Sequence, residues 1–330
     1  MIKRILLWLL AIAAVLAVAV ALAFRFTPWP SVAIIQYVFS RGDQASEAAL
    51  EKHVPANIVT RRDLAYGKGP DETLDVNYPE GTNGPLPTIV WAHGGGWIGG
   101  SKAGIANYLK VLAGHGYTTV GVEYSTGFGS TYPKPVEQVN AALGYLAGNA
   151  GALNIDPGAI VLAGDSAGAQ IAAQIAIIIT DPSYAGRMGI SPTLDPKRLD
   201  GVLLLSGAFD MEQLDLNGRF GWFVRTVLWA YSGTRDFMND ERFALISVTH
   251  HVTSAFPPAF ISSGNGDPLA PQAVALAQRL GTLGVKADSL FFPDDYTPPL
   301  PHEYQFNLDT PAGQEALART LAFVKAWVQP

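Results

Sequence analysis

The sequence contains no cysteine among its 330 residues, which excludes disulfide bonds, thiolate metal ligands and a cysteine nucleophile. Charged residues make up only 15% of the chain, and acids outnumber bases by 28 to 22, for a net charge of −6. Because there is no basic excess, the composition argues against a nucleic-acid partner. Internal repeats and low-complexity segments are also missing after residue 27. The remaining length fits one large α/β domain.

One long hydrophobic run is present, from Ile5 to Phe24, and it is closed by Arg25. About 20 apolar residues are enough to cross a bilayer as a helix, whereas the core of a signal peptide usually has about 7–15. We therefore predict a transmembrane anchor over residues 1–27, with a cleaved signal segment and a buried helix as the alternatives. Positive residues at the extreme N-terminus, Lys3 and Arg4, place that end in the cytoplasm and the rest of the chain outside. A cleaved signal would instead give a secreted or periplasmic protein.

Residues 28–57 form a separate stretch that we interpret as a linker, a possible cap or an interfacial segment. Its apolar part, Val32 to Phe39, fits contact with a bilayer surface, cover over a site, or ordinary packing on the domain. Arg41 to His53 is typical of a polar helix. The globular domain is expected to span residues 58–330.

Within that domain, strand-like and helix-like segments alternate, which predicts an α/β fold with a mainly parallel central sheet and helices on both faces. The expected strands are 73–78, 87–92, 117–124, 159–163, 201–206, 259–263 and 287–292. The expected helices are 103–113, 136–147, 169–179, 272–283 and 313–328. The alternation stops at about 208–256, which we interpret as a cap insertion. Its aromatic residues Trp222 and Trp229, together with Trp97 outside it, are candidates for binding an apolar part of a substrate.

The central motif is Gly164-Asp165-Ser166-Ala167-Gly168, which lies between an apolar strand and a helix built of small and aliphatic residues. This strand, tight G-x-S-x-G turn and helix form the setting of a nucleophile elbow. In such a strained turn, the positions two residues before and two residues after the serine have no room for a side chain. Glycine occupies both positions here, as Gly164 and Gly168. Ser166 is therefore the candidate nucleophile.

A second glycine motif precedes the elbow: the strand ending at Ala92 continues into His93-Gly94-Gly95-Gly96-Trp97. Amides in a loop at this place can stabilise an oxyanion. We expect the amides of Gly94, Gly95, Gly96 and Ala167 to form the oxyanion hole. A phosphate-binding loop is the weaker interpretation, because the Gly-Lys-Ser/Thr ending is missing.

A serine nucleophile needs a base and a carboxylate that orients it, and here both should follow the serine. His302 comes after the last expected strand and is the candidate base, whereas His250 and His251 fall in the insertion. Asp267 follows the strand 259–263 and is the candidate acid, with Asp294 and Asp295 as alternatives. These groups suffice for acyl transfer through a covalent intermediate, so no cofactor or metal is expected.

The motifs His93 to Trp97, Gly164 to Gly168, Asp267-Pro268-Leu269 and His302 resemble those of the hormone-sensitive-lipase-like and feruloyl-esterase-like branch of the α/β-hydrolases, over about residues 58–328. The resemblance implies hydrolysis of carboxylic esters, often with short acyl chains. An amidase or peptidase using the same triad, and a non-catalytic membrane-tethered binding protein on the same scaffold, are the alternatives. The sequence does not indicate an oligomeric state.

Two departures from that branch stand out. Many relatives have Asp-Tyr-Arg where this chain has Glu123-Tyr124-Ser125, so an arginine that supports the glycine loop is missing. Relatives usually continue the catalytic histidine as His-Gly-Phe, whereas this chain reads His302-Glu303-Tyr304. We expect the first change to affect the loop and the second to affect the acyl pocket.

Overall fold

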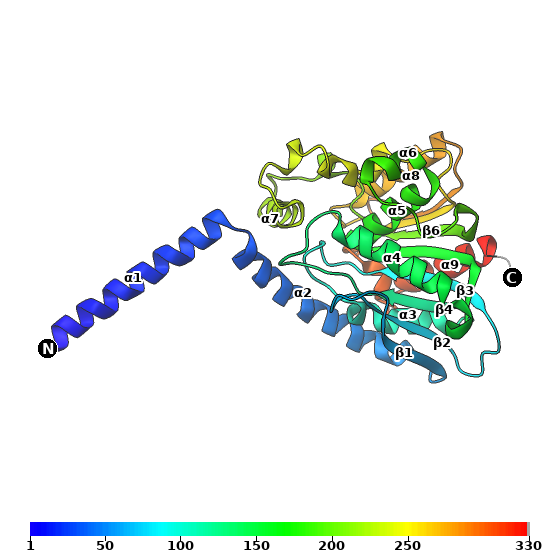
Figure 1. Cartoon of the computed structure of the whole chain (residues 1–330), viewed down its shortest axis with the longest axis horizontal. Helices are drawn as coiled ribbons and strands as arrows, with labels where there is room; N and C mark the ends of the chain where they lie inside the picture. Colours follow the sequence, from blue (N-terminus) through cyan, green and yellow to red (C-terminus); the bar gives the residue numbers. More distant parts are fainter. Residues whose placement is uncertain (329–330) are drawn as a thin grey trace.

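The computed structural model describes residues 1–328 and has one eight-stranded sheet at its centre (Figure 1). The strands lie in the order β1-β2-β4-β3-β5-β6-β7-β8. Strands β3 to β8 run parallel to one another, whereas β2 is antiparallel to both β1 and β4. The bounds are β1 Ile58–Ala65, β2 Thr73–Pro79, β3 Leu86–Ala92, β4 Thr118–Val122, β5 Ile155–Asp165, β6 Leu199–Leu205, β7 Ala259–Ser263 and β8 Ala287–Phe291. The predicted α/β class with a mainly parallel sheet is confirmed.

Helices cover both faces of this sheet, because the central strands carry apolar side chains in both directions. On β5, Val161 and Ala163 pack with the cluster that contains residues of α3 and α9, whereas Leu162 packs with the cluster that contains residues of α4, α5 and α8. A strand buried on both sides reads as a continuous apolar run, as 159–163 does. The helices on the sheet are α3 Ala106–Ala113, α4 Lys134–Gly148, α5 Ser166–Thr180, α8 Ala270–Thr282 and α9 Pro311–Trp327.

Two elements of the domain were not expected. Strand β1 is an edge strand with Arg61, Arg62 and Asp63 at its centre. It therefore lacks the alternation of apolar and polar residues by which a strand is predicted. Helix α6, Pro182–Met188, is only seven residues long, and the Asp181 side chain caps it by accepting from the amides of Ser183 and Tyr184.

The N-terminal part of the chain forms two helices. Helix α1, Ile2–Phe26, has 25 residues, none of them buried, and a window of mean hydropathy 3.0. Within residues 1–328 it is the one helix long and apolar enough to cross a membrane. Figure 1 shows α1 projecting away from the domain and α2 running along the domain's side.

Helix α2 spans Trp29–Leu50 without a break, which corrects the expectation that the apolar stretch 32–39 and the polar helix 41–53 are separate. Val32 and Ile35 on its inner face are buried. The Gln36 side chain donates to the carbonyl of Ile98 over 2.6 Å, and the Glu47 carboxylate accepts from the amide of Asn107. One helix therefore combines an apolar half and a polar half, both fastened to the domain.

The insertion at 208–256 contains helix α7, Gly221–Ser232, and several short 3₁₀ turns. Two buried glutamines of α5 hold its later part: Gln170 donates to the carbonyl of Ile246 over 3.1 Å, and Gln174 donates to that of Leu245 over 3.2 Å. Because these bonds start from the helix that follows Ser166, the insertion is fixed directly to the element behind the elbow.

Candidate active site

The three candidate catalytic residues and the glycine loop all lie on segments that follow the carboxyl ends of parallel strands. Ser166 follows β5, Asp267 follows β7 and His302 follows β8, and the glycine loop that begins at His93 follows β3. In open α/β sheets this edge is where ligands bind. The sheet topology therefore brings together residues that are up to 209 positions apart, counted from His93 to His302.

The elbow has the strained geometry that its motif suggests. Ser166 has φ of +50°, a left-handed conformation that is unusual for serine. A Cβ atom on Gly168 would lie 2.0 Å from the carbonyl oxygen of Ala92, and one on Gly164 would lie 2.4 Å from the backbone of Gly168. Both distances are far inside van der Waals contact, so only glycine fits at these two positions.

The structure places Ser166, His302 and Asp267 in one hydrogen-bonded line. His302 Nε2 lies 3.0 Å from Ser166 Oγ, and His302 Nδ1 lies 3.0 Å from Asp267 Oδ2. Asp267 is 3% exposed and also accepts from the hydroxyl of Ser263 and the amide of Leu269. Burial raises the pKa of Asp267, but the His302 side chain and these two donors outweigh it, so the pKa lies below its ordinary value.

The alternative residues lie elsewhere. Asp294 and Asp295 are exposed, and His250 Nε2 pairs with Asp210 Oδ2 at 3.2 Å. His251 lies near Arg187, with 3.5 Å between His251 Nδ1 and Arg187 Nη2. None of these four side chains forms a hydrogen bond with Ser166 or His302 in the described part of the chain.

The glycine loop curls back on itself beside Ser166. Gly95 and Gly96 have φ of +117° and +59°, and the amide of Gly99 donates to the Gly95 carbonyl over 2.9 Å. The amide of Gly94 faces the carboxyl of Asp165. Ala167 lies in the first turn of α5, where helix amides have no partner within the helix. The structure thus sets Gly94 apart from the other three expected donors.

Side chains other than arginine hold the segment after β4 and join it to the glycine loop. Gln138 accepts from the amide of Ser125 over 2.8 Å, and the Ser130 hydroxyl donates to the carbonyl of Ser125 over 2.7 Å. The His93 ring stacks on Tyr124, with 4.1 Å between ring centroids and 6° between planes. The Tyr124 hydroxyl donates to the carbonyl of His93, which joins the loop to the strand beside it.

A carboxyl pair that the sequence did not reveal lies against the triad. Glu303 directly follows His302 with φ of +59°, and its Oε1 lies 3.5 Å from His302 Nε2. The buried Asp165 accepts from Trp91 Nε1 over 2.7 Å and forms a carboxyl hydrogen bond with Glu303. Burial and the neighbouring charge of Glu303 raise the pKa of Asp165 well above its ordinary value, which favours the protonated form of Asp165.

The charge around His302 is therefore strongly negative. Burial lowers the pKa of His302, but the charge of Glu303 and the hydrogen bond and charge of Asp267 more than compensate and raise it to about 9. Asp43 of α2 belongs to the same acidic surroundings, since burial and then the charge of Glu303 raise its pKa. A histidine in this setting holds a proton readily and favours the imidazolium that forms during acyl transfer.

The three tryptophans proposed as substrate contacts lie in different surroundings. Trp97 is 4% exposed, stacks on Tyr231 and donates to Gln170 Oε1 over 3.0 Å, so its side chain is part of the core. This placement argues against direct substrate contact by Trp97. Trp222 is 53% exposed on α7, and Trp229 is half-buried beneath Arg235. The described residues show neither of them beside Ser166.

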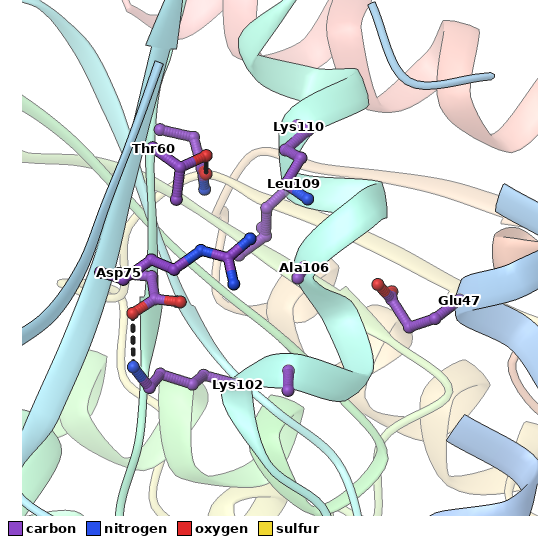
Figure 2. A pocket seen from close by; sticks show the side chains of 11 residues that line it. Glu47, Thr60, Asp75, Lys102, Ala106, Leu109 and Lys110 are labelled. Atoms are coloured by element: carbon purple, nitrogen blue, oxygen red, sulfur yellow. Dashed lines mark hydrogen bonds and ion pairs between the residues drawn. The ribbon is translucent and has the colours of Figure 1, made fainter. Parts of the chain in front are cut away.

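A separate polar hollow of about 220 Å³ lies between α2, α3 and the sheet, away from the triad (Figure 2). Figure 2 shows Glu47 of α2 on one side of it and Asp75 of the sheet on the other. Lys102 forms ion pairs with Asp63 and Asp75 there. The amide of Lys102 also donates to Glu123, so this charged cluster supports the far side of the glycine loop.

Comparison with known proteins agrees with this architecture. A solved structure of esterase B from Lactobacillus rhamnosis superimposes with a TM-score of 0.77, covering 91% of this chain and 96% of that one at 22% identity, which shows the fold. Among relatives by sequence, an esterase of Gibberella moniliformis is 30% identical over 72% of this chain and 75% of its own length. Esterase LipC of Mycobacterium tuberculosis is 27% identical over 76% of this chain and 64% of its own length.

The fold and these relatives define the class: the protein is an α/β-hydrolase that acts on carboxylic esters. Residues 74–280, more than half of the chain, match the model of the family described as BD-FAE. The chain belongs to the BD-FAE family. The resemblance stated from the motifs alone is thereby confirmed.

Proposed function

We propose that the chain hydrolyses carboxylic esters of short to medium acyl length with Ser166 as nucleophile, His302 as general base and Asp267 as the orienting acid. The observation that carries this proposal is the pair of 3.0 Å contacts that His302 makes, one to Ser166 Oγ and one to Asp267 Oδ2. In the reaction, Ser166 Oγ attacks the ester carbonyl carbon while His302 Nε2 takes the hydroxyl proton. Asp267 keeps the other ring nitrogen protonated, which leaves Nε2 free to accept.

The tetrahedral oxyanion is bound by amides of the glycine loop and the elbow. Gly95, Gly96 and Ala167 are the favoured donors, because the Gly94 amide faces Asp165. Losing one such donor typically costs about 2.7–4 kcal/mol of transition-state stabilisation. When the intermediate collapses, His302 returns the proton to the leaving alkoxide and an acyl-Ser166 ester remains. Water then attacks that ester while His302 takes its proton, and when the acyl–Oγ bond breaks His302 returns the proton to Ser166 Oγ and the acid leaves.

The N-terminal helix suggests where in the cell this reaction takes place. Helix α1 is uncharged from Ile5 to Phe24, has no buried residue, and carries Lys3 and Arg4 in its first turn. We propose that it is a retained anchor that holds the catalytic domain on the extracytoplasmic side, with cleavage as a signal segment as the alternative. Mass spectrometry of the membrane-extracted protein distinguishes these, because cleavage removes residues before about position 25.

The direct test is labelling with a fluorophosphonate, followed by peptide mapping. We expect the adduct on Ser166 in the full-length chain and its loss in His302→Ala, with His250→Ala labelled as strongly as the unmodified protein. Turnover of p-nitrophenyl butyrate should fall to background in Ser166→Ala. An adduct on another serine, or turnover retained by Ser166→Ala, would refute the assignment.

A further inference from the structure

Aromatic and arginine side chains gather where α1 meets the domain. We call this surface the aromatic–arginine face and define it by its members: Phe26, Trp29, Tyr37, Phe128, Phe220, Trp222, Trp229, Arg25, Arg41, Arg219 and Arg235. Several of these aromatics are strongly exposed, with 83% for Phe128, 64% for Tyr37 and 53% for Trp222. Exposed aromatics in such a group mark an interaction surface more often than a bare protein surface.

Contacts join the segments that carry the face, although these segments are distant in sequence. Trp29 at the start of α2 meets Phe128 edge-to-face, with 5.0 Å between ring centroids. Phe39 of α2 meets Phe223 of α7 at 6.0 Å, and Arg235 donates to the backbone carbonyl of Arg25. The 127–129 loop and α7 therefore both meet the N-terminal helices, and Figure 1 shows α7 near the junction of α1 and α2.

Each arginine of the face lies over an aromatic ring. Arg235 lies 4.0 Å from the centroid of Trp229, and the other pairs are Arg219 with Phe220 at 5.6 Å, Arg41 with Tyr37 at 5.9 Å and Arg25 with Phe26 at 6.0 Å. The face thus carries four of the 22 basic residues of a chain whose net charge is −6. Aromatic rings at headgroup depth and cations that attract anionic lipids are the two signals of a membrane interface.

We propose that the aromatic–arginine face lies on the headgroups of the phospholipid bilayer that holds α1. Only Thr27 and Pro28 separate α1 from α2, so an inserted α1 places the first turn of α2 at the bilayer surface. The outer side of α2 also exposes Ile34 and Val38, at 52% and 59%, as an in-plane interfacial helix does. The proposal rests on the anchor of the proposed function, and is independent of its catalytic residues.

Contact at this face also places the glycine loop near the bilayer. A methyl group on Gly96 would touch Val227 of α7 at 3.6 Å and Phe39 of α2 at 3.7 Å, so the two helices that carry the face pack against the loop itself. The substrate class this favours is an ester that partitions into the bilayer, delivered to Ser166 from the surface on which the protein lies.

The absence of cysteine makes a clean test possible. The full-length chain is reconstituted in phosphatidylcholine vesicles containing phosphatidylglycerol, with a single fluorophore on Phe128→Cys, on Tyr37→Cys, or on the control Ala318→Cys. Ala318 is an exposed residue of α9, on the side of the domain away from α1. Two quenchers are compared: a lipid with a nitroxide near the headgroup, and iodide in the water.

We expect the lipid nitroxide to quench the Phe128→Cys and Tyr37→Cys labels and iodide to quench only the Ala318→Cys label. Quenching of all three labels by iodide alone would overturn the proposal, because the face would then be in water. Protection of the two face labels from both quenchers would also overturn it, in favour of a second copy of the chain. None of these readouts requires turnover, so failure here is distinct from failure of the proposed triad.

A kinetic measurement tests the delivery of substrate. Phe128→Ser should lower the rate on a diacylglycerol held in the same vesicles and leave the rate on water-soluble p-nitrophenyl acetate unchanged. Thr282→Ser, on α8, is the matched exposed control and should change neither rate. Equal rates of Phe128→Ser and unmodified protein on the vesicle ester would contradict delivery from the bilayer.

Discussion

Glu303 Oε1 lies 3.5 Å from His302 Nε2, the same nitrogen that lies 3.0 Å from Ser166 Oγ. The carboxylate and the nucleophile therefore share one nitrogen of the base. Glu303 stabilises the protonated imidazole of His302. This favours the imidazolium that forms when Ser166 loses its proton, but it lowers the fraction of neutral His302 that is needed to start the reaction. The balance between these two effects depends on pH.

Replacing Glu303 by Gln should move the pH dependence of kcat/KM. His302 has a pKa of about 9, so the fraction of neutral base, and with it kcat/KM, should rise with pH through about 9. The charge of Glu303 is the largest of the effects that raise this pKa, so Glu303→Gln should shift the rising limb toward lower pH. The measurement is kcat/KM for p-nitrophenyl butyrate from pH 5 to 10.

Glu137→Gln serves as the control for that measurement. Glu137 is exposed on α4, and its replacement should leave the rising part of the kcat/KM pH profile at the same pH. A limb at the same pH in Glu303→Gln would mean that this carboxylate does not control His302.

Replacing Asp267 by Asn should lower kcat by about 10⁴-fold, because the imidazole is then held in the wrong tautomer. Asp294→Asn and Asp295→Asn should keep nearly full activity, since both side chains are exposed and lie outside the hydrogen bonds of the triad. Steady-state kinetics with all three variants decides the matter, with circular dichroism to verify folding. If Asp294→Asn or Asp295→Asn lost most of the activity while Asp267→Asn stayed active, the orienting acid would lie on the 294–295 loop and Asp267 would not have this role.

Much of the fold, and the candidate triad, could be inferred from the sequence because local signals agree with one another. Strand β5 is apolar on both faces, and the steric need for Gly164 and Gly168 follows from the elbow geometry alone. The order of serine, acid and histidine then narrows the partners to residues that follow successive strands. These inferences use neighbours in sequence or simple topology.

Other features depended on contacts that sequence spacing does not encode. Asp165 and Glu303 are 138 positions apart, and the raised pKa of Asp165 arises only because folding buries its carboxyl beside that of Glu303. Trp97 follows the glycine loop and was expected at the substrate, but its indole reaches Gln170 and enters the core. The continuity of α2 was hidden because its apolar half and polar half read as different elements.

Replacing Gly168 by Ala should prevent correct folding of the elbow. The added Cβ would lie 2.0 Å from the Ala92 carbonyl oxygen, which is backbone in a central strand and unable to move aside. We expect a loss of stability of about 3 kcal/mol or more, together with loss of fluorophosphonate labelling. The measurement is urea denaturation followed by tryptophan fluorescence.

Gly186→Ala is the matched control for the elbow glycine. Gly186 lies in helix α6 with open space around its Cβ position, so alanine should raise stability there by about 0.5–1 kcal/mol. If Gly168→Ala proved as stable as Gly186→Ala, the close packing of α5 against β3 would be wrong.

Replacing Asp165 by Asn should make the protein more stable at alkaline pH. Burial and the charge of Glu303 raise the pKa of Asp165, so the folded state keeps a proton that the unfolded chain releases above about its ordinary value of 3.8. The free energy of unfolding must therefore fall as pH rises above that value, until the folded-state pKa is passed. An asparagine amide can accept from Trp91 and donate to Glu303 with no proton to lose, so it removes this cost.

The measurement for Asp165→Asn is Tm between pH 5 and 9. His302 adds its own dependence in both proteins: its pKa of about 9 means that its stabilisation is complete below about 6.5 and is lost as pH rises through 9. The difference in Tm between Asp165→Asn and unmodified protein should therefore grow with pH, whereas Asp71→Asn, at an exposed turn, should show a constant difference. A difference that shrinks with pH would mean that Asp165 is ionised in the folded protein and that Glu303 is not its proton-sharing partner.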